Sequence, residues 1–409
     1  MKQNTTYKQT ELGLIPEDWE VKKLGEILKE YSLGGNYENN SEESGIPLIK
    51  MGNIGRGKID LSKIEYLPKN VNYSKNDILK YNDILFNTRN TLDLVGKVSI
   101  WKNEALFALY NSNLLRLYFK EDFVENNDYV NFQFNSEITL ANLKKYATGT
   151  TSVAAIYTKD LLKLKFLLPP LPEQKKIADC LSTWDVAIEK QSALINALTD
   201  RKKALMQQLL TGKKRLPGFS GEWKEVKLGE IIIDYKEKPN DNNNYEILTS
   251  SKNGLMKQTD YYGDDRITNR TDADYNVIPN GFITYRSRSD DGLFTFNLND
   301  LGVIGLISGY YPVFSFAKSN TQFLLSFLNY FKSKLIKYAI GTSQLVLSIN
   351  ALKEAKFKLP SLEEQTAIAE ILTIADRELQ LQKEKLAQLQ TQKKGLMQVL
   401  LTGKKRLIN

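Results

Sequence analysis

Two separate parts of the chain place arginine and lysine among asparagine, serine and threonine. Guanidinium groups, amides and hydroxyls are the groups that read base edges in DNA and hold its phosphates. The composition therefore predicts two DNA-contacting surfaces, although solvated surface loops share it. In the first part the candidates are Lys50, Asn53, Arg56, Lys58, Asn87, Thr88, Arg89, Asn90 and Lys97. In the second part they are Lys252, Asn253, Arg266, Tyr285, Arg286, Ser287 and Arg288.

A glycine followed by polar side chains comes late in each part, at residues 149–152 and 341–344. Glycine lets a backbone approach a ligand closely, and hydroxyls with free amides can hold a phosphate oxygen. An ordinary turn before a strand is the alternative. The added candidates for DNA contact are Thr150, Thr151, Ser152, Thr342, Ser343 and Gln344.

The residues needed for most kinds of enzyme chemistry are missing. The chain has no histidine and one cysteine, Cys180. This excludes Ser-His-Asp and Cys-His nucleophiles, histidine-ligated zinc sites and an internal disulfide. No phosphate-binding P-loop and no dinucleotide-binding fingerprint occurs either. We therefore expect a non-catalytic binding protein with no metal or cofactor of its own.

The length of 409 residues suggests two to four domains. No run of 18 charge-free apolar residues is present, and the first residues carry no apolar signal core. We expect a cytoplasmic protein.

An internal repeat organises the chain. Residues 166–216 align without a gap to residues 357–407, with 25 identities in 51 positions. A weaker repeat follows Trp19 and Trp223, where Leu-Gly-Glu-Ile recurs. The order is therefore module, helix, module, helix, and the predicted boundaries are 1–168, 169–216, 217–359 and 360–409.

Each repeated segment is predicted to form one long helix of about 38 residues, or roughly 57 Å. Glu173 and Glu364 suit the positive start of a helix, and Gly212 and Gly403 suit a left-handed cap at its end. Apolar residues recur at alternating spacings of four and three, which favours coiled-coil packing of the two helices. An ordinary helix packed on its own module is the alternative. The first predicted interface comprises Ile177, Leu181, Trp184, Ile188, Gln191, Ile195, Leu198, Leu205 and Leu209. The second comprises Ile368, Leu372, Leu379, Gln382, Leu386, Leu389, Leu396 and Leu400.

Positive charge is concentrated on these helices. The net charge is +8, of which residues 173–216 carry +4 and residues 364–409 carry +3. The modules are close to neutral. If they bind DNA, they must do so with local basic faces rather than by bulk attraction.

The ordered double set of motifs resembles the specificity subunit of a type I restriction-modification system. The resemblance covers essentially the whole chain. Its most specific marks are Pro-x-Leu-x-Glu-Gln at the start of each long helix and Leu-Leu-Thr-Gly-Lys-Lys-Arg-Leu at its end. The segment Ile46-Pro-Leu-Ile-Lys-Met-Gly-Asn53 adds support, since it resembles the early strand motif of a target recognition domain.

The resemblance implies an α+β fold with two mixed α/β target recognition domains, separated by two long helices in an antiparallel coiled coil with pseudo-twofold symmetry. It implies that each domain reads one half of a split asymmetric sequence in double-stranded DNA. Two methylation subunits would methylate adenine with S-adenosylmethionine, and restriction subunits would cut with ATP and Mg²⁺. The near-neutral modules further suggest that methylation subunits complete the DNA clamp.

One departure concerns the second module, where Tyr245–Ser250 is only a loose counterpart of the early strand motif. Two alternatives stay open on the sequence alone. The chain could be a recognition subunit of another modification system, identified by the partner that co-purifies with it. It could also be a coiled-coil scaffold with no DNA role, although two diverged modules then have no explanation.

Overall fold

The computed structural model describes residues 6–43, 45–240, 245–252, 254–262 and 275–407. These residues form two compact units. Unit 1 comprises Met1–Ser192 with Glu384–Asn409, and unit 2 comprises Ala193–Lys383. Each unit therefore joins one predicted module to parts of both long helices, because the helix boundaries do not coincide with the limits of the compact units.

The elements of unit 1 follow the chain up to its first long helix. Its strands are β1 (Tyr7–Thr10), β2 (Gly13–Pro16), β3 (Glu20–Lys23), β4 (Leu28–Leu33), β5 (Ile46–Ile49), β6 (Glu65–Leu67), β7 (Ile84–Asn87), β8 (Arg89–Asn90), β9 (Val98–Ile100), β10 (Leu109–Tyr110), β11 (Leu114–Phe119), β12 (Thr148–Gly149), β13 (Ala154–Ala155) and β14 (Lys165–Leu168). Its short helices are α1 (Leu24–Ile27), α2 (Asn127–Phe134), α3 (Glu137–Tyr146) and α4 (Thr158–Leu161), with 3-10 turns at Met51–Asn53 and Lys75–Asp77.

The described elements of unit 2 follow a similar order. Its strands are β15 (Lys224–Lys227), β16 (Ile232–Tyr235), β17 (Glu246–Ser251), β18 (Gly254–Lys257), β19 (Tyr275–Ile278), β20 (Ile283–Tyr285), β21 (Arg288–Ser289), β22 (Phe296–Leu298), β23 (Gly305–Ser308), β24 (Val313–Phe316), β25 (Leu345–Val346) and β26 (Lys356–Leu359). Its short helices are α6 (Gln258–Tyr262), α7 (Thr321–Tyr330) and α8 (Ile349–Lys353), with 3-10 segments at Leu228–Glu230 and Lys332–Tyr338. The long helices are α5 (Leu171–Leu209) and α9 (Leu362–Leu400).

Each unit is built around a four-stranded antiparallel sheet. The strand order is β4-β11-β7-β9 in unit 1 and β16-β24-β20-β22 in unit 2. Residues 114–117 of β11 are all buried, as expected for an inner strand that is covered on both faces. A second antiparallel pair brings the start of each module beside its end, with β3 against β14 and β15 against β26. The matching order shows that the frame is duplicated.

The early strand of each module also has the same surroundings. β5 pairs in parallel with β10, where Leu48 faces Leu109. β17 pairs in parallel with β23, where Ile247 faces Leu306. The segment that matches only loosely in sequence is therefore the structural counterpart of the early strand motif.

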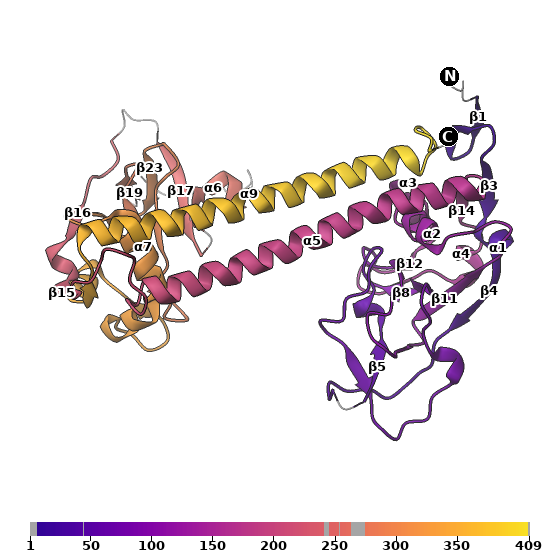
Figure 1. Cartoon of the computed structure of the whole chain (residues 1–409), viewed down its shortest axis with the longest axis horizontal. Coiled ribbons are helices and arrows are strands. Elements are labelled where there is room, and N and C mark those ends of the chain that lie inside the picture. The colour runs from indigo at the N-terminus through magenta and orange to yellow at the C-terminus, as the bar shows by residue number, and fades with distance from the viewer. Residues whose placement is uncertain (1–5, 44, 241–244, 253, 263–274, 408–409) are drawn as a thin grey trace. The chain divides into compact units, whose positions relative to one another are not determined.

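The two long helices pack against each other in antiparallel fashion (Figure 1). In unit 1 the start of α5 shares a core with the end of α9, through Ile177, Leu181 and Leu400. In unit 2 Leu209, near the end of α5, shares a core with Ile368 and Leu372 near the start of α9. The predicted fold class is confirmed. Both helices also pack on their modules, so the two predicted packing modes occur together.

The residues predicted for the helix interface are buried or half-buried in the structure, from Ile177 to Leu209 and from Ile368 to Leu400. The predicted glycine caps have left-handed backbones, with φ +69° at Gly212 and +71° at Gly403. In the described part of the chain, no helix combines the length and apolarity needed to cross a bilayer.

Two ion pairs replace apolar contacts along the helix pair. Lys393 of α9 lies 2.7 Å from Asp185 of α5, and Lys202 of α5 pairs with Asp376 of α9. Each lysine interrupts the apolar repeat and has its aspartate on the other helix. Since a one-turn slip would separate both pairs, we infer that they help to fix the register of the helices.

We expect Asp185→Lys to weaken unit 1 by about 1 kcal/mol, because it places a positive charge beside Lys393 at a half-buried position. The double variant Asp185→Lys with Lys393→Asp should recover most of this loss. Denaturant unfolding of the wild type, the two single variants Asp185→Lys and Lys393→Asp, and the double variant gives the coupling energy. Additive losses without recovery would mean that this pair does not act as a register contact.

Candidate nucleic-acid interface

In unit 1 strand β8, which directly follows β7 of the central sheet, lies beside the glycine loop. Arg89 and Asn90 of β8 face Ala155 and Ala154 of β13, and β13 in turn pairs with β12, which ends at Gly149. The amide of Ile156 donates to the carbonyl of Thr88 at 3.0 Å. Two groups of candidates that are far apart in the sequence therefore meet at one small three-stranded sheet, with residues 150–152 in the loop between two of its strands.

Unit 2 contains the same junction. Arg288 and Ser289 of β21 face Val346 and Leu345 of β25. The amide of Leu347 donates to the carbonyl of Ser287 at 2.9 Å. The side chain of Gln344, in the glycine loop, donates to Asp290 at 2.9 Å. The structure thus brings together the same two sets of candidates in both units.

The two loop glycines are needed for this geometry. Gly149 has φ +128° and Gly341 has φ +121°. A Cβ atom would lie 2.3 Å from the carbonyl oxygen of Val153 in the first loop and 2.2 Å from that of Gln344 in the second. Since backbone atoms cannot move aside cheaply, only glycine fits at either position.

We expect Gly341→Ala to destabilise unit 2 by about 1–3 kcal/mol, because it adds both backbone strain and a clash. Gly221→Ala is the matched control, since a Cβ atom at that position would meet no heavy atom within 4 Å and the backbone there is not left-handed. Thermal unfolding of both variants checks this. Equal melting temperatures would show that the loop relaxes freely.

The remaining candidates of unit 1 differ in how freely they face solvent. Lys50 pairs with Glu65 at 2.8 Å, and Lys58 lies 3.8 Å from Asp185 of α5. Arg56, Arg89 and the loop side chains from Thr150 to Ser152 are exposed. Thr88, Asn90 and Lys97 are half-buried. These residues stay predictions as DNA contacts.

Four of the predicted contacts have buried side chains, and they too stay predictions. Asn53 accepts from the Lys50 amide and donates to the Asp60 carbonyl, each at 2.9 Å. Asn87 accepts from the Arg89 amide at 3.2 Å. The other two are Tyr285 and Ser287, whose hydroxyls donate to backbone carbonyls. The hydrogen bonds of these four side chains are to the backbone, and the Asn87 amide nitrogen has no partner among the described residues.

Two further candidates, Asn253 and Arg266, lie outside the described residues. Thr342 and Ser343 are exposed in the second loop, and Gln344 is half-buried. They too stay predictions.

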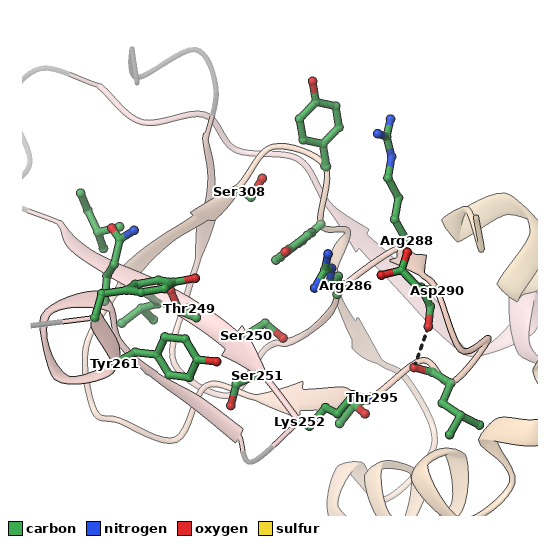
Figure 2. A pocket seen from close by; sticks show the side chains of 18 of the residues that line it. Thr249, Ser250, Ser251, Lys252, Tyr261, Arg286, Arg288, Asp290, Thr295 and Ser308 are labelled. Carbon is green, nitrogen blue, oxygen red and sulfur yellow. Dashed lines mark hydrogen bonds between the residues drawn. The ribbon is translucent and has the colours of Figure 1, made fainter. Parts of the chain in front are cut away.

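A pocket of about 930 Å³ opens in unit 2 beside this junction (Figure 2). Four sequence candidates line it, namely Lys252, Arg286, Arg288 and Gln344. Sequence reasoning missed the other polar lining residues, which come from β17, α6 and the loops around β22 and β23. These include Thr249, Ser250, Ser251, Tyr261, Tyr262, Asp290, Asp291, Thr295 and Tyr310. The signal that could have found some of them is the run of hydroxyl residues at the end of β17.

The basic side chains that line the pocket differ in whether they have a partner within the protein. Lys252 lies 2.8 Å from Asp291, and hydrogen bonds from Lys252 and Ser289 hold the pKa of that carboxyl well below its usual range. The Arg288 guanidinium lies 4.9 Å from the centre of the Tyr310 ring, a cation–π distance. Arg286 is exposed, and no carboxylate of the described residues lies within 4.0 Å of it. The pocket can therefore accept a polar, electron-rich group.

Elsewhere, the repeated ends of the long helices meet each other. Arg406, just after α9, donates to Glu173 in the first turn of α5 at 2.7 Å. Arg215, just after α5, donates to Glu364 in the first turn of α9 at 2.6 Å. The hydrogen bond with Glu173 raises the pKa of Arg406, and that with Glu364 raises the pKa of Arg215. The repeated basic ends thus serve the frame, at least through their arginines.

Comparison with known proteins agrees with this architecture. The family model for the type I restriction modification DNA specificity domain matches residues 16–200 and again residues 220–391. The putative MjaX type I restriction enzyme specificity subunit of Methanocaldococcus jannaschii is 29% identical, over 98% of this chain and 97% of its own length. The MjaVIII specificity subunit of the same organism is 27% identical, over 97% and 95%.

Solved structures share the fold. The type I restriction-modification S subunit from M. genitalium aligns with a TM-score of 0.57 at 15% identity, covering 93% of this chain and 96% of its own. A chain from a structure of type I system complex assembly and conformational transition aligns with a TM-score of 0.54 at 16% identity, covering 96% and 99%. With two tandem matches to one family model, the chain belongs to the type I restriction-modification specificity subunits and carries two DNA specificity domains.

Proposed function

We propose that each unit reads one half of a split, asymmetric DNA sequence. The observation that carries this proposal is the junction of strand and glycine loop, which recurs in both units with side chains that differ in part. An arginine is shared, Arg89 in unit 1 and Arg288 in unit 2, but the next residue is Asn90 in one and Ser289 in the other. A shared frame with different reading groups is what recognition of two unrelated half-sequences requires.

The chemistry would belong to partner subunits. Two methylation subunits would dock on the specificity subunit and methylate adenine with S-adenosylmethionine, and restriction subunits would supply ATP- and Mg²⁺-dependent cutting. The complete absence of histidine and of nucleotide-binding motifs from the sequence supports a non-catalytic role. The complex would act on chromosomal and incoming DNA in the cytoplasm.

The near-neutral modules support a division of binding between subunits. Electrostatic attraction to phosphates supplies most non-specific affinity for DNA. Since the net charge of the modules is close to zero, the isolated chain should bind DNA weakly and with strong salt sensitivity. Tight, salt-resistant binding by the purified chain would contradict this division.

Methylome sequencing tests the proposal. The chain is expressed with its methylation subunit in a host that lacks adenine methylation, and the methylation subunit alone is the control. We expect a split asymmetric motif with a methylated adenine in each half, seen only when both proteins are present. A stable complex that leaves the genome unmethylated, or that methylates without a sequence motif, would overturn the proposal.

A further inference from the structure

The pocket of unit 2 presents two arginines from one short segment of backbone. Arg286 follows β20 and Arg288 begins β21, and both side chains are exposed. In Figure 2 the Arg286 side chain lies within the pocket, between Tyr261 and Arg288. Along residues 285–288 buried and exposed side chains alternate.

The residues on the interior side anchor the segment. Tyr285 is fully buried, and its hydroxyl donates to the carbonyl of Leu347 at 2.9 Å. Ser287 is buried too, and its hydroxyl donates to the carbonyl of Tyr310 at 2.7 Å. Arg286 therefore stands between two fixed neighbours. A guanidinium carried on a rigid backbone loses less conformational freedom when it binds than one on a free loop.

The other cations at the pocket are already occupied. Lys252 is paired with Asp291 at 2.8 Å, and Arg288 lies over the Tyr310 ring. Arg286 has neither kind of partner among the described residues. Its planar fork of N–H donors is thus available to a ligand that presents two acceptors side by side.

In DNA, the O6 and N7 atoms of guanine form such a pair of acceptors in the major groove. We infer that Arg286 determines one base of the half-site read by unit 2, by donating two hydrogen bonds to a guanine. Arg288, held against Tyr310, contacts the phosphate backbone of the DNA next to that base and so positions the DNA on the unit. This inference rests on the proposed function and names the residue and the base that carry part of its specificity.

The test is the methylome of the complete complex with Arg286→Ala. We expect one G·C position in one half of the motif to become degenerate, with discrimination at that base falling by about 5- to 150-fold. The other half should be unchanged, which also shows that the variant folds and assembles. Arg286→Gln should shift the preference at the same position toward adenine, since a glutamine amide pairs with that base.

Two further variants separate base reading from phosphate contact. Arg288→Ala should keep the motif while fewer of its copies are methylated, because a backbone contact carries no direct sequence information. Lys224→Ala removes an exposed charge from β15, away from the pocket, and should leave both motif and extent of methylation as in the wild type.

The outcomes that overturn the inference are distinct from failure of the proposed function. If the wild type gives no split motif, the proposed function fails. If it gives one and Arg286→Ala retains the same motif at every position, or loses methylation uniformly at all copies, Arg286 does not read a base. A base change in Arg288→Ala without one in Arg286→Ala would also overturn the assignment.

Discussion

Glu173→Gln should lower the free energy of unfolding of unit 1 by about 3–5 kcal/mol. The Glu173 carboxylate is almost fully buried, and it accepts hydrogen bonds from Arg406 and from the indole of Trp19 at 3.0 Å. Loss of its charge leaves the buried guanidinium of Arg406 with only the exposed Asp18 as an acidic partner among the described residues. The expected loss is at the lower end of the range because Asp18 still offsets part of that charge.

Denaturant unfolding followed by tryptophan fluorescence measures this loss, because Trp19 lies against Arg406, with its ring 5.9 Å from the guanidinium carbon. Glu364→Gln in unit 2 is the matched control. There the side chain of Arg215 is 26% exposed, and the Trp223 indole has no hydrogen-bond partner among the described residues. We expect a smaller loss, about 1–3 kcal/mol. Equal losses in the two variants would show that the tryptophan contact and the deeper burial contribute nothing.

Replacing residues 217–359 with the corresponding module of another specificity subunit should change one half of the methylated motif and leave the other half as it was. The effect on that half is complete, since every base contact made by unit 2 is replaced. The exchange is feasible because the replaced segment begins just after Leu216 and ends with β26 (Lys356–Leu359), just before Pro360 and α9. The arginine–glutamate contacts at the helix ends stay in the retained frame.

Methylome sequencing of the chimera measures the result, and the parent chain is the control. A chimera that assembles with the methylation subunit but alters both halves would mean that the units do not read DNA independently. One that retains the parental motif would place recognition outside residues 217–359.

The long helices, their caps and the duplicated frame could be predicted from the sequence. Apolar periodicity, glycine at the helix ends and a repeat of 51 residues are local or self-comparing signals. The periodicity shows which face of each long helix is apolar and must be buried, and the repeat shows that the chain contains a second helix of the same kind. The family resemblance depends on the same repeated segments.

The site was only partly predictable. Composition identifies Arg286 and Arg288, but it places Tyr285 and Ser287 with them, although the strand alternation turns these two inward. Asn53 and Asn87 are buried as well, and composition could not show this because an amide suits a turn as well as it suits a base. The hydroxyl and tyrosine residues that complete the pocket come from β17, α6 and separate loops, and only the run of hydroxyl residues at the end of β17 gives a local signal.

The sequence by itself determined the module–helix–module–helix order, the apolar faces of the two long helices and the family, since these depend on local periodicity and on a repeat within one chain. Only the tertiary structure decided that Arg406 contacts Glu173, 233 residues away. It also decided that the glycine loops lie beside β8 in unit 1 and β21 in unit 2. Such contacts depend on strand register and chain reversal, and no local pattern encodes which distant backbone a residue will face.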